Sequence, residues 1–465
     1  MRTTDENDVI RVHGNVGKYA LEYPQEFKFA EEYELTVDDT RIPTDRYTSP
    51  EVLREEIETT WMRTWQLACR EEQVAEIGAY YEYRIAGRSY LVVRGEDCRL
   101  RAFVNSCRHR GKLIRTGSGT TDELRCGYHY WCWGLDGSLA DIPDRHVFVG
   151  IDDDEYALGQ IACDTWAGFV FVNPDTSCPP LSEYLGDVTT QLAPYNMDKF
   201  RANLHASLEI DCNWKVAIEA FIETYHVQGI HPQIMPYVDD FNTKFDIMGD
   251  HTRYIVPFGV PSMRIEHIDE AEVYESHQRA LRKPGLRDRS TPPPPETRVE
   301  LPADLFNEQG EWIGEGTLRD HLIDLTRERG ESLGHDYSGL GHAQLVDDYH
   351  YHIFPSMYFN LHAGALLLFR SRPHATDPNK SHFDVWRLFM PDLTKPMPEP
   401  AQEFRADFEQ TSFGTVLDQD FENLPEVQAG LKNPEVEFVT LGGAEIRIIN
   451  FHKVLRQYAQ RFGAK

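Results

Sequence analysis

The chain has 465 residues, of which 41% are hydrophobic and 26% charged, a composition typical of a folded protein with about two to four domains. Its 47 lysines and arginines against 76 aspartates and glutamates leave a net charge of −29, which argues against nucleic acid or an anionic membrane as a partner. The longest apolar runs, such as residues 364–369, are far shorter than the roughly 20 residues that cross a bilayer. The first eight residues are polar with no apolar stretch behind them, so we expect no secretory signal and a cytoplasmic protein.

The first part of the chain predicts an arm followed by a small β domain. Residues 1–50 are polar and rich in turn residues, and we expect them to form an N-terminal arm that packs on a later domain. Apolar residues recur at helical spacing from residue 51 to about residue 65. Four strand patterns follow, and the boundary after them lies near residue 178; the strand patterns cover residues 80–85, 89–93, 100–104 and 168–172.

Residues 179–465 mix helical and strand patterns and predict a second, larger domain, so the expected fold class is α+β. Residues 211–231 predict one long helix, and residues 444–462 predict another. Residues 275–345 are polar and contain four consecutive prolines, which predicts a partly mobile surface insertion. Strand patterns return in three further runs, at residues 349–359, 364–371 and 382–390.

Two of the eight cysteines stand in a metal-binding pattern. Cys107 is followed by His109 after one intervening residue, and Cys126 is followed by His129 after two. Two such loops at the tips of neighbouring hairpins could supply two thiolates and two imidazoles to one metal centre. Zinc accepts the same donors, so a mononuclear zinc site is the alternative. Cys132 is offset from this pattern, and we expect it to be no ligand.

The pattern C-x-H, sixteen residues, C-x-x-H, with Arg and Gly after the first histidine, resembles the Rieske 2Fe-2S domain. The resemblance implies that Cys107 and Cys126 bind one iron of a 2Fe-2S cluster and that His109 and His129 bind the other. Tyr130 departs from the family motif, in which a small residue commonly follows the second histidine. By this resemblance residues 51–178 are expected to form a small antiparallel β Rieske domain.

A second group of candidate ligands lies within residues 211–231. Glu219, Glu223 and His226 are spaced by four and three residues, which would place them on one helical face. His231 is five residues beyond His226, and a nearby Gly and Pro supply the break that turns its imidazole toward the same centre. Two imidazoles and one carboxylate that leave open positions are the ligand set of non-haem Fe(II) oxygenases.

This segment resembles the iron-binding helix of Rieske non-haem iron oxygenase α subunits, whose motif is N-W-K, E-N-F, then acid-x-x-H-x4-H. The match implies that His226 and His231 bind one mononuclear Fe(II) ion. Ala220 stands where the family usually has Asn, and Glu223 stands where Asp is more common. The resemblance extends over about residues 50–465 and implies that residues 179–465 form a helix-grip-type catalytic domain around a central antiparallel sheet.

The third iron ligand must come from another part of the chain. An acidic segment before V-Q-A-G-L resembles the family segment that carries it, and the match implies Asp420, with Asp418 as the alternative. A single aspartate at such a place is otherwise a helix cap or a solvated acid. His350 and His352 alternate on a predicted strand and could bind a metal, but a structural role is expected for them.

The resemblance also implies how the two centres communicate. In the family, a head-to-tail homotrimer places the cluster of one subunit beside the iron of the next, and a carboxylate three residues before the first iron-binding histidine bridges them. Glu223 holds that position and is the expected catalytic carboxylate. The chain has neither a G-x-G-x-x-G fingerprint nor a flavin domain, so NAD(P)H must be oxidised by a separate reductase, directly or through a ferredoxin.

The expected activity is that of a terminal oxygenase that uses O2 and these electrons to hydroxylate an organic substrate. The 12% of aromatic residues and the apolar run at residues 366–369 favour an apolar or aromatic substrate. Oxidative N- or O-demethylation of a small molecule is the alternative within the class. A non-catalytic electron carrier or redox sensor, with about two iron atoms per chain in place of three, is the alternative from another class. The presence of a small β subunit stays open.

Overall fold

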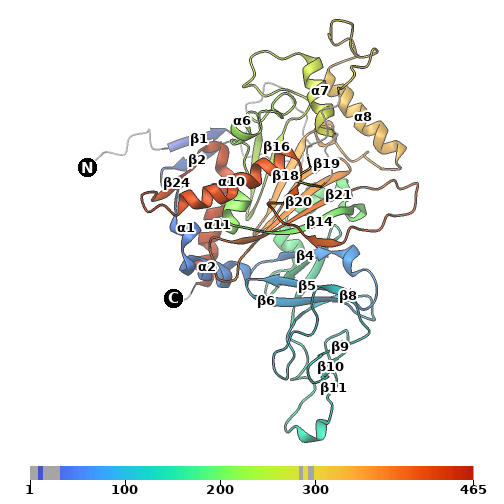
Figure 1. Cartoon of the computed structure of the whole chain (residues 1–465), viewed down its shortest axis with the longest axis vertical. Coiled ribbons are helices and arrows are strands. Elements are labelled where there is room, and N and C mark those ends of the chain that lie inside the picture. Colours follow the sequence, from blue (N-terminus) through green and yellow to red (C-terminus); the bar gives the residue numbers. More distant parts are fainter. Residues whose placement is uncertain (1–8, 14–31, 282–285, 292–297, 464–465) are drawn as a thin grey trace.

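The computed structural model describes residues 9–13, 32–281, 286–291 and 298–463. Its two large β-sheets lie one above the other along the long axis of the molecule, and the C-terminal helices pack beside the upper sheet (Figure 1). The architecture is mixed α+β, as the sequence predicts. Within the described part of the chain, no helix is both long and apolar enough to cross a membrane.

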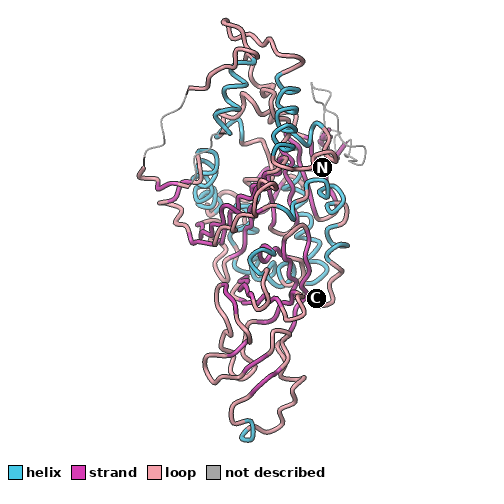
Figure 2. The backbone as a smooth tube through the Cα atoms, turned by 90° about the vertical axis from the view of Figure 1, so that its right-hand side faces the viewer, coloured by secondary structure: helices cyan, strands magenta, loops and turns pink. Residues whose placement is uncertain are grey.

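The lower sheet is antiparallel and has the strand order β4-β13-β12-β7-β6-β5-β8. It contains all four strands predicted between residues 80 and 172. A three-stranded sheet of order β11-β10-β9 extends from it to one end of the long axis, as both views show (Figure 1 and Figure 2). The strands are β4 (Gln66–Arg70), β5 (Ala79–Ile85), β6 (Arg88–Arg94), β7 (Leu100–Val104), β8 (Ser118–Thr120), β9 (Leu124–Arg125), β10 (Cys132–Trp133), β11 (Leu139–Asp141), β12 (Gln160–Trp166) and β13 (Phe169–Asn173).

The upper sheet has the order β15-β16-β18-β19-β20-β21-β14-β22. Its strands pair antiparallel except for β22, which runs parallel to β14. Most of its side chains are buried, because helices or the lower sheet cover it. The strands are β14 (Arg201–Ile210), β15 (Lys244–Met248), β16 (His251–Val256), β18 (Asp348–Ile353), β19 (Met357–His362), β20 (Ala365–Pro373), β21 (Ser381–Phe389) and β22 (Glu403–Arg405).

Helices pack on the upper sheet; of the predicted iron ligands, Asp420 lies in one of them, and His226 and His231 flank another. α5 contacts β20 and β21, α10 contacts α5, and α11 contacts β15 and α2. The helices are α1 (Asp45–Thr48), α2 (Pro50–Glu56), α3 (Leu181–Leu185), α4 (Val188–Leu192), α5 (Trp214–Glu219), α6 (Val227–Ile230), α7 (Glu270–Leu281), α8 (Leu318–Ser332), α9 (His342–Val346), α10 (Thr415–Leu431) and α11 (Ile446–Phe462).

The described part of the predicted arm lies against the C-terminal part of the chain. β1 (Val9–His13) pairs with β2 (Glu32–Thr36), and β3 (Arg41–Pro43) pairs with β24 (Phe438–Thr440). The remaining described pair of short strands is β17 (Arg287–Asp288) with β23 (Thr411–Ser412). Residues 1–8 and 14–31 of the arm lie outside the described residues.

The prediction of one helix over residues 211–231 is wrong. The helix ends at Glu219, and a separate turn, α6, begins at Val227. The Glu223 carboxylate accepts the backbone N–H groups of Tyr225 and His226, so a side chain replaces the carbonyls that a continuous helix would offer.

One other prediction needs correction. The strand pattern at residues 349–359 forms two strands, β18 and β19, which turn at Pro355 because proline cannot donate to a ladder. The polar segment at residues 275–345, predicted to be a surface insertion, contains α8 and parts of α7 and α9. Its proline run at residues 292–295 lies outside the described residues.

Candidate metal centres

Cys107 and Cys126 open two loops with the same backbone hydrogen bonds. In each loop the cysteine N–H donates, at 2.8 Å, to the carbonyl five residues later. The N–H four residues later donates back to the cysteine carbonyl, from Gly111 at 2.9 Å and from Tyr130 at 3.0 Å. Both of those residues have positive φ, 80° and 64°. Glycine adopts this conformation freely, whereas it is sterically unfavourable for a tyrosine. Tyr130 stands at the position where the sequence departs from the Rieske motif.

The two loops bring the four predicted cluster ligands together. Cys107 and Cys126 are buried, and burial together with the neighbouring thiol raises the pKa of Cys107. The rings of His109 and His129 lie nearer the surface, with centroids 4.5 Å apart. His109 Nδ1 is buried without a hydrogen-bond partner, which is an unsatisfied position that a metal would complete. Two inner thiols and two outer imidazoles fit a cluster with one Cys-bound and one His-bound iron.

A small hydrophobic core of its own supports these loops. The Trp131 ring stacks on His109, with centroids 5.0 Å apart and planes 6° from parallel, and Phe148 packs on both rings. Cys132 lies outside the group, because its thiol donates to the Glu123 carboxylate at 3.1 Å. Apolar walls exclude water from a cluster and thereby influence its reduction potential.

The second predicted site joins residues from both ends of α6 to a residue of α10. His231 Nε2 lies 2.8 Å from Asp420 Oδ1, and His226 Nε2 lies 3.7 Å from the same oxygen. One ligand atom from each of the three residues lies within 4.8 Å of the others. His231 and Asp420 are buried, and His226 is about a quarter exposed. Two imidazoles and one carboxylate in this arrangement suit a divalent iron ion with open coordination positions.

Glu223 holds the His226 ring. Its carboxylate accepts His226 Nδ1–H and the backbone N–H groups of Tyr225 and His226, the last at 3.2 Å. This contact leaves Nε2 of His226 directed toward Asp420. Burial lowers the pKa of His226, but the carboxylates of Glu223 and Asp420 outweigh burial and hold that pKa above its usual value. A metal at this site would therefore displace a proton from His226.

Gln419 plays the corresponding part for His231, and the sequence interpretation missed it. Its side-chain oxygen accepts His231 Nδ1–H at 2.9 Å and the Gln233 amide at 2.7 Å. Gln419 therefore fixes the ring so that Nε2 faces Asp420. The only available signal was its position directly before Asp420, which does not by itself indicate where the side chain points.

Other candidates from the sequence lie away from this centre. Asp418 accepts the Ser412 hydroxyl at 2.5 Å and the Phe413 N–H at 2.8 Å, so it ties the first turn of α10 to the segment before it. Glu219 does not share a face with Glu223, contrary to the prediction, because the helix ends between them. His350 and His352 are buried in β18, where His350 Nδ1 accepts from an arginine of α11.

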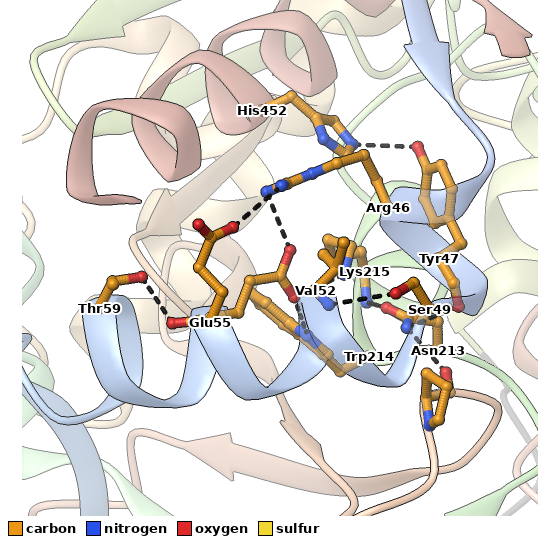
Figure 3. A network of polar contacts seen from close by, with 12 residues as sticks. Arg46, Tyr47, Ser49, Val52, Glu55, Thr59, Asn213, Trp214, Lys215 and His452 are labelled. Carbon is orange, nitrogen blue, oxygen red and sulfur yellow. Dashed lines mark hydrogen bonds and ion pairs between the residues drawn. The ribbon is translucent and has the colours of Figure 1, made fainter. Parts of the chain in front are cut away.

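The N-W-K segment anchors α5 to the N-terminal helices (Figure 3). Asn213 accepts the Lys215 N–H at 3.0 Å and donates to the Tyr47 carbonyl at 2.9 Å. Trp214 Nε1 and Lys215 Nζ donate to the Glu56 carboxylate at 3.2 Å and 2.7 Å. The start of α5 is thus fixed one turn and a half before the loop that carries Glu223 and His226.

The other end of α5 is held in the same way. Glu219 accepts the Tyr47 hydroxyl at 2.9 Å and His452 Nε2 at 2.7 Å. The Tyr47 hydroxyl and His452 Nε2 are themselves 3.0 Å apart (Figure 3). These contacts give Glu219 a role in joining three segments of the chain.

A second group of donors, His205, Asp384 and Glu403, also has ligand atoms within 4.8 Å of one another. The Asp384 carboxylate already accepts hydrogen bonds from Arg370 at 2.8 Å and Arg372 at 2.9 Å. Two guanidinium groups at this distance neutralise the carboxylate and repel a cation, so we assign no metal here.

Two family models match the chain. The Rieske [2Fe-2S] domain matches residues 64–151, which contain both cysteine loops. The ring hydroxylating alpha subunit (catalytic domain) matches residues 197–461, more than half of the chain. The chain belongs to the ring hydroxylating alpha subunit family. The two matches imply one Rieske 2Fe-2S cluster and one mononuclear iron as the cofactors of this alpha subunit.

Similar proteins include oxygenases with different named substrates. The alpha subunit is 28% identical over 265 residues to the glycine betaine monooxygenase oxygenase subunit of Chromohalobacter salexigens, covering 55% of this chain and 56% of that protein. It is 29% identical over 194 residues to the carnitine monooxygenase oxygenase subunit of Escherichia coli, covering 41% and 52%. It is 30% identical over 202 residues to the biphenyl 2,3-dioxygenase subunit alpha of Rhodococcus jostii, covering 40% and 43%. The chain therefore spans about half of the length of these relatives.

Solved structures share the fold. A quaternary ammonium Rieske monooxygenase that oxidises carnitine superposes with a TM-score of 0.62 at 17% identity, covering 90% of this chain and 95% of that chain. Naphthalene 1,2-dioxygenase from Rhodococcus sp. gives a TM-score of 0.60 at 19% identity, covering 92% and 96%. Both architectures agree with the two-sheet arrangement of this alpha subunit.

Proposed function

We propose that this chain is a terminal oxygenase component that oxidises an organic substrate with O2. A separate NAD(P)H reductase, directly or through a ferredoxin, supplies the electrons. The main observation behind the proposal is that His226, His231 and Asp420 lie close together in a chain that also has the two Cys–His loops. When bound, the 2Fe-2S cluster would transfer single electrons and the Fe(II) ion would bind O2.

We propose that the chain divides into an arm at residues 1–50, a Rieske domain at 51–178 and a catalytic domain at 179–465. The polar segment 275–345 belongs to the last of these. The two family matches, at residues 64–151 and 197–461, fall inside the proposed domains and support these boundaries.

The proposed roles of the protein residues follow from their contacts. Cys107, His109, Cys126 and His129 would hold the cluster, and His226, His231 and Asp420 would hold the iron. Glu223 and Gln419 would keep each iron-binding imidazole in the tautomer that presents Nε2 to the metal. Each ring would then be oriented before iron binds, so binding costs little reorganisation.

We propose a head-to-tail homotrimer in which electrons pass between subunits. The cluster loops lie near the lower end of the molecule, whereas α6 and α10 lie in its upper part (Figure 1). Within one chain the two centres are therefore separated by most of the lower sheet and the upper sheet. A heterologous contact repeated around a closed ring would bring the cluster of one subunit to the iron of the next. Glu223, which already holds His226, would bridge to a cluster histidine of the neighbouring subunit.

Quaternary ammonium compounds are the first proposed substrates. The glycine betaine and carnitine monooxygenases among the relatives support this class, and the net charge of −29 would attract a cationic substrate. The reaction would be monooxygenation, with oxidative N-demethylation as its outcome where the oxidised carbon is an N-methyl group. Hydroxylation of an aromatic hydrocarbon is the second candidate, and the biphenyl dioxygenase relative supports it.

The test supplies the iron-loaded protein with a surrogate reductase, NADH and labelled O2. One panel contains glycine betaine, carnitine and choline, and the other contains biphenyl and naphthalene. Labelled oxygen in a hydroxylated product, or formaldehyde released from an N-methyl group in proportion to the O2 consumed, would support the oxygenase, and the panel that reacts identifies the substrate class. Cluster reduction without oxidation of any compound and without O2 consumption would support the non-catalytic electron carrier instead.

A further inference from the structure

Two arginines of β20 reach from the upper sheet to the lower sheet. Arg370 and Arg372 have side chains that are only 1% and 10% exposed. Arg370 Nη1 donates to the backbone carbonyls of Leu67 and Ala68 in β4, at 2.8 Å and 2.7 Å. Arg372 Nη1 donates to the Arg84 carbonyl in β5 at 2.6 Å. Both side chains therefore hold the main chain of the sheet that carries the cluster loops.

One aspartate fixes both arginines. Asp384 lies opposite Arg370 in the β20–β21 ladder and is completely buried. It accepts from Arg370 Nε at 2.8 Å and from Arg372 Nη2 at 2.9 Å and 3.1 Å. Burial of Asp384 raises its pKa, but the two guanidinium groups outweigh burial and hold that pKa well below its usual range. The carboxylate is thus ionised and keeps both planar guanidinium groups in one orientation.

Aromatic rings from both sheets enclose the same contact. The guanidinium carbon of Arg370 lies 5.3 Å from the ring centre of Tyr83 in β5 and 4.9 Å from that of Trp386 in β21. A planar group that is hydrogen-bonded at its edge and covered by rings on its faces has little freedom to tilt. We call Arg370, Arg372 and Asp384 the arginine joint.

We propose that the arginine joint sets the angle between the two sheets and thereby positions the cluster of one subunit for electron transfer to the iron of the next. This inference rests on the proposed function. β4, whose main chain Arg370 bonds, lies next to the upper sheet, whereas β9 and β10, which flank the Cys126 loop, lie toward the opposite end of the molecule (Figure 1). A small tilt at the joint is therefore enlarged at the cluster. Arg370 and Arg372 are positioning residues.

The test uses Arg370→Lys and Arg372→Lys in the iron-loaded holoenzyme. Lysine keeps the charge but cannot bond Asp384 and a cross-sheet carbonyl with one rigid fork. Arg253→Lys is the matched control, because Arg253 is equally buried and bonds Asp246 at 3.0 Å within the upper sheet. Glycine betaine is the first probe. If the wild type does not oxidise it, another compound that the wild type does oxidise takes its place.

Three measurements separate positioning from a general structural defect. We expect the joint variants to keep the cluster spectrum and iron content, while oxidation of the reduced cluster during a single turnover with O2 slows by about ten- to a hundredfold. Product formation driven by H2O2, which supplies both oxygen and oxidising equivalents and needs no electron from the cluster, should match that of Arg253→Lys. Arg372→Lys, which alters only one cross-sheet bond, serves if Arg370→Lys fails to fold.

Unchanged cluster oxidation in both joint variants would overturn the inference. An equal loss of the O2-driven and H2O2-driven reactions would overturn it as well, because that result indicates a damaged catalytic domain. A wild-type protein that oxidises no compound with either oxidant would instead refute the proposed function, so the two failures are distinguishable.

Discussion

Glu223 connects local folding to the chemistry proposed for the iron site. Its carboxylate accepts two backbone N–H groups in the turn that follows α5, and it also accepts His226 Nδ1–H. The same side chain thus creates the turn that brings His226 to Asp420 and fixes the ring within it. A carboxylate with three donors in one chain still has lone pairs for a donor from a second subunit.

Glu223→Gln tests this role. We expect the variant to bind both iron centres but to lose about 10- to 100-fold in NAD(P)H-driven turnover, because an amide offers one acceptor where the carboxylate offers two. Iron content, the cluster spectrum and turnover are measured together. Glu426→Gln, an exposed change on α10, is the control for the lost charge. Unchanged turnover in Glu223→Gln would refute the bridge.

Asp420 and Asp418 can be compared as candidates for the third iron ligand. Asp420→Ala should reduce the iron content from about three to about two atoms per chain and leave the cluster spectrum unchanged. Asp418→Asn should keep the third iron, because Asp418 binds Ser412 and the Phe413 backbone and is not among the residues whose ligand atoms meet His226 and His231. Elemental analysis of both proteins decides the assignment. The opposite pattern would make Asp418 the ligand.

Sequence spacing was sufficient to predict which side chains lie together when they are close along the chain. The loops of Cys107 and Cys126 followed from a motif, and so did the pairing of His226 with His231. Asp420 lies 189 residues from His231 and was predicted only because its segment resembles a family motif. Gln419, 188 residues from His231, has no such motif position and reaches the ring only through the packing of α10 on α5. The contact between Glu219 and His452 spans 233 residues and escaped prediction for the same reason.

At the scale of elements, the sequence predicted part of each sheet and the C-terminal helix, since the periodicity of these segments is strong. It did not predict β4, β8 and β12 of the lower sheet or β14, β15, β16 and β22 of the upper sheet. It failed for residues 211–231, where apolar spacing continues but a side chain replaces the backbone hydrogen bonds. Helical periodicity reports which side of a segment is buried and cannot detect such a substitution. The helix break is also where the proposed ligands lie, so local departure from the pattern coincides with the site.

The buried ion pair at the start of α5 should stabilise this element. Lys215 and Glu56 are 0% and 2% exposed and 2.7 Å apart. Lys215→Met leaves one of the Glu56 carboxylate oxygens without its cation, and we expect a loss of about 3–5 kcal/mol in the free energy of unfolding. Unfolding in guanidinium chloride, followed by tryptophan fluorescence, measures this loss as a shift of the transition midpoint.

Arg54→Met is the control for Lys215→Met, because it breaks an ion pair in α2 whose side chains are 70% and 73% exposed. Water already solvates both of those groups, so the midpoint should stay at the wild-type value. Equal midpoints for the two variants would show that burial does not strengthen the Lys215–Glu56 contact.

At the scale of the whole molecule, buried neutral histidines should make stability depend on pH. Burial lowers the pKa of His205 and of His352 to about 3 each. In the unfolded chain both pKa values return to about 6.5, so the unfolded state binds more protons between these limits. The contribution of these two histidines to the free energy of unfolding is therefore fully present above about pH 6.5. It decreases as the pH falls toward 3, by up to about 1.4 kcal/mol per pH unit for each histidine.

His352→Gln tests this pH dependence. Glutamine can replace the hydrogen bond from His352 Nε2 to the Pro355 carbonyl but does not titrate. We expect the free energy of unfolding to decrease less steeply between pH 6.5 and pH 4.5 in the variant than in the wild type. Urea denaturation at several pH values gives both slopes, and parallel slopes would contradict the assignment of a neutral buried imidazole.

The central claim is that one chain holds two unlike iron centres. The most direct test is to measure iron, zinc and acid-labile sulfide in the purified protein together with its low-temperature electron paramagnetic resonance spectrum after reduction. The account predicts about three iron atoms and about two sulfides per chain, with a Rieske-type signal. A colourless protein that contains zinc and no labile sulfide would contradict it.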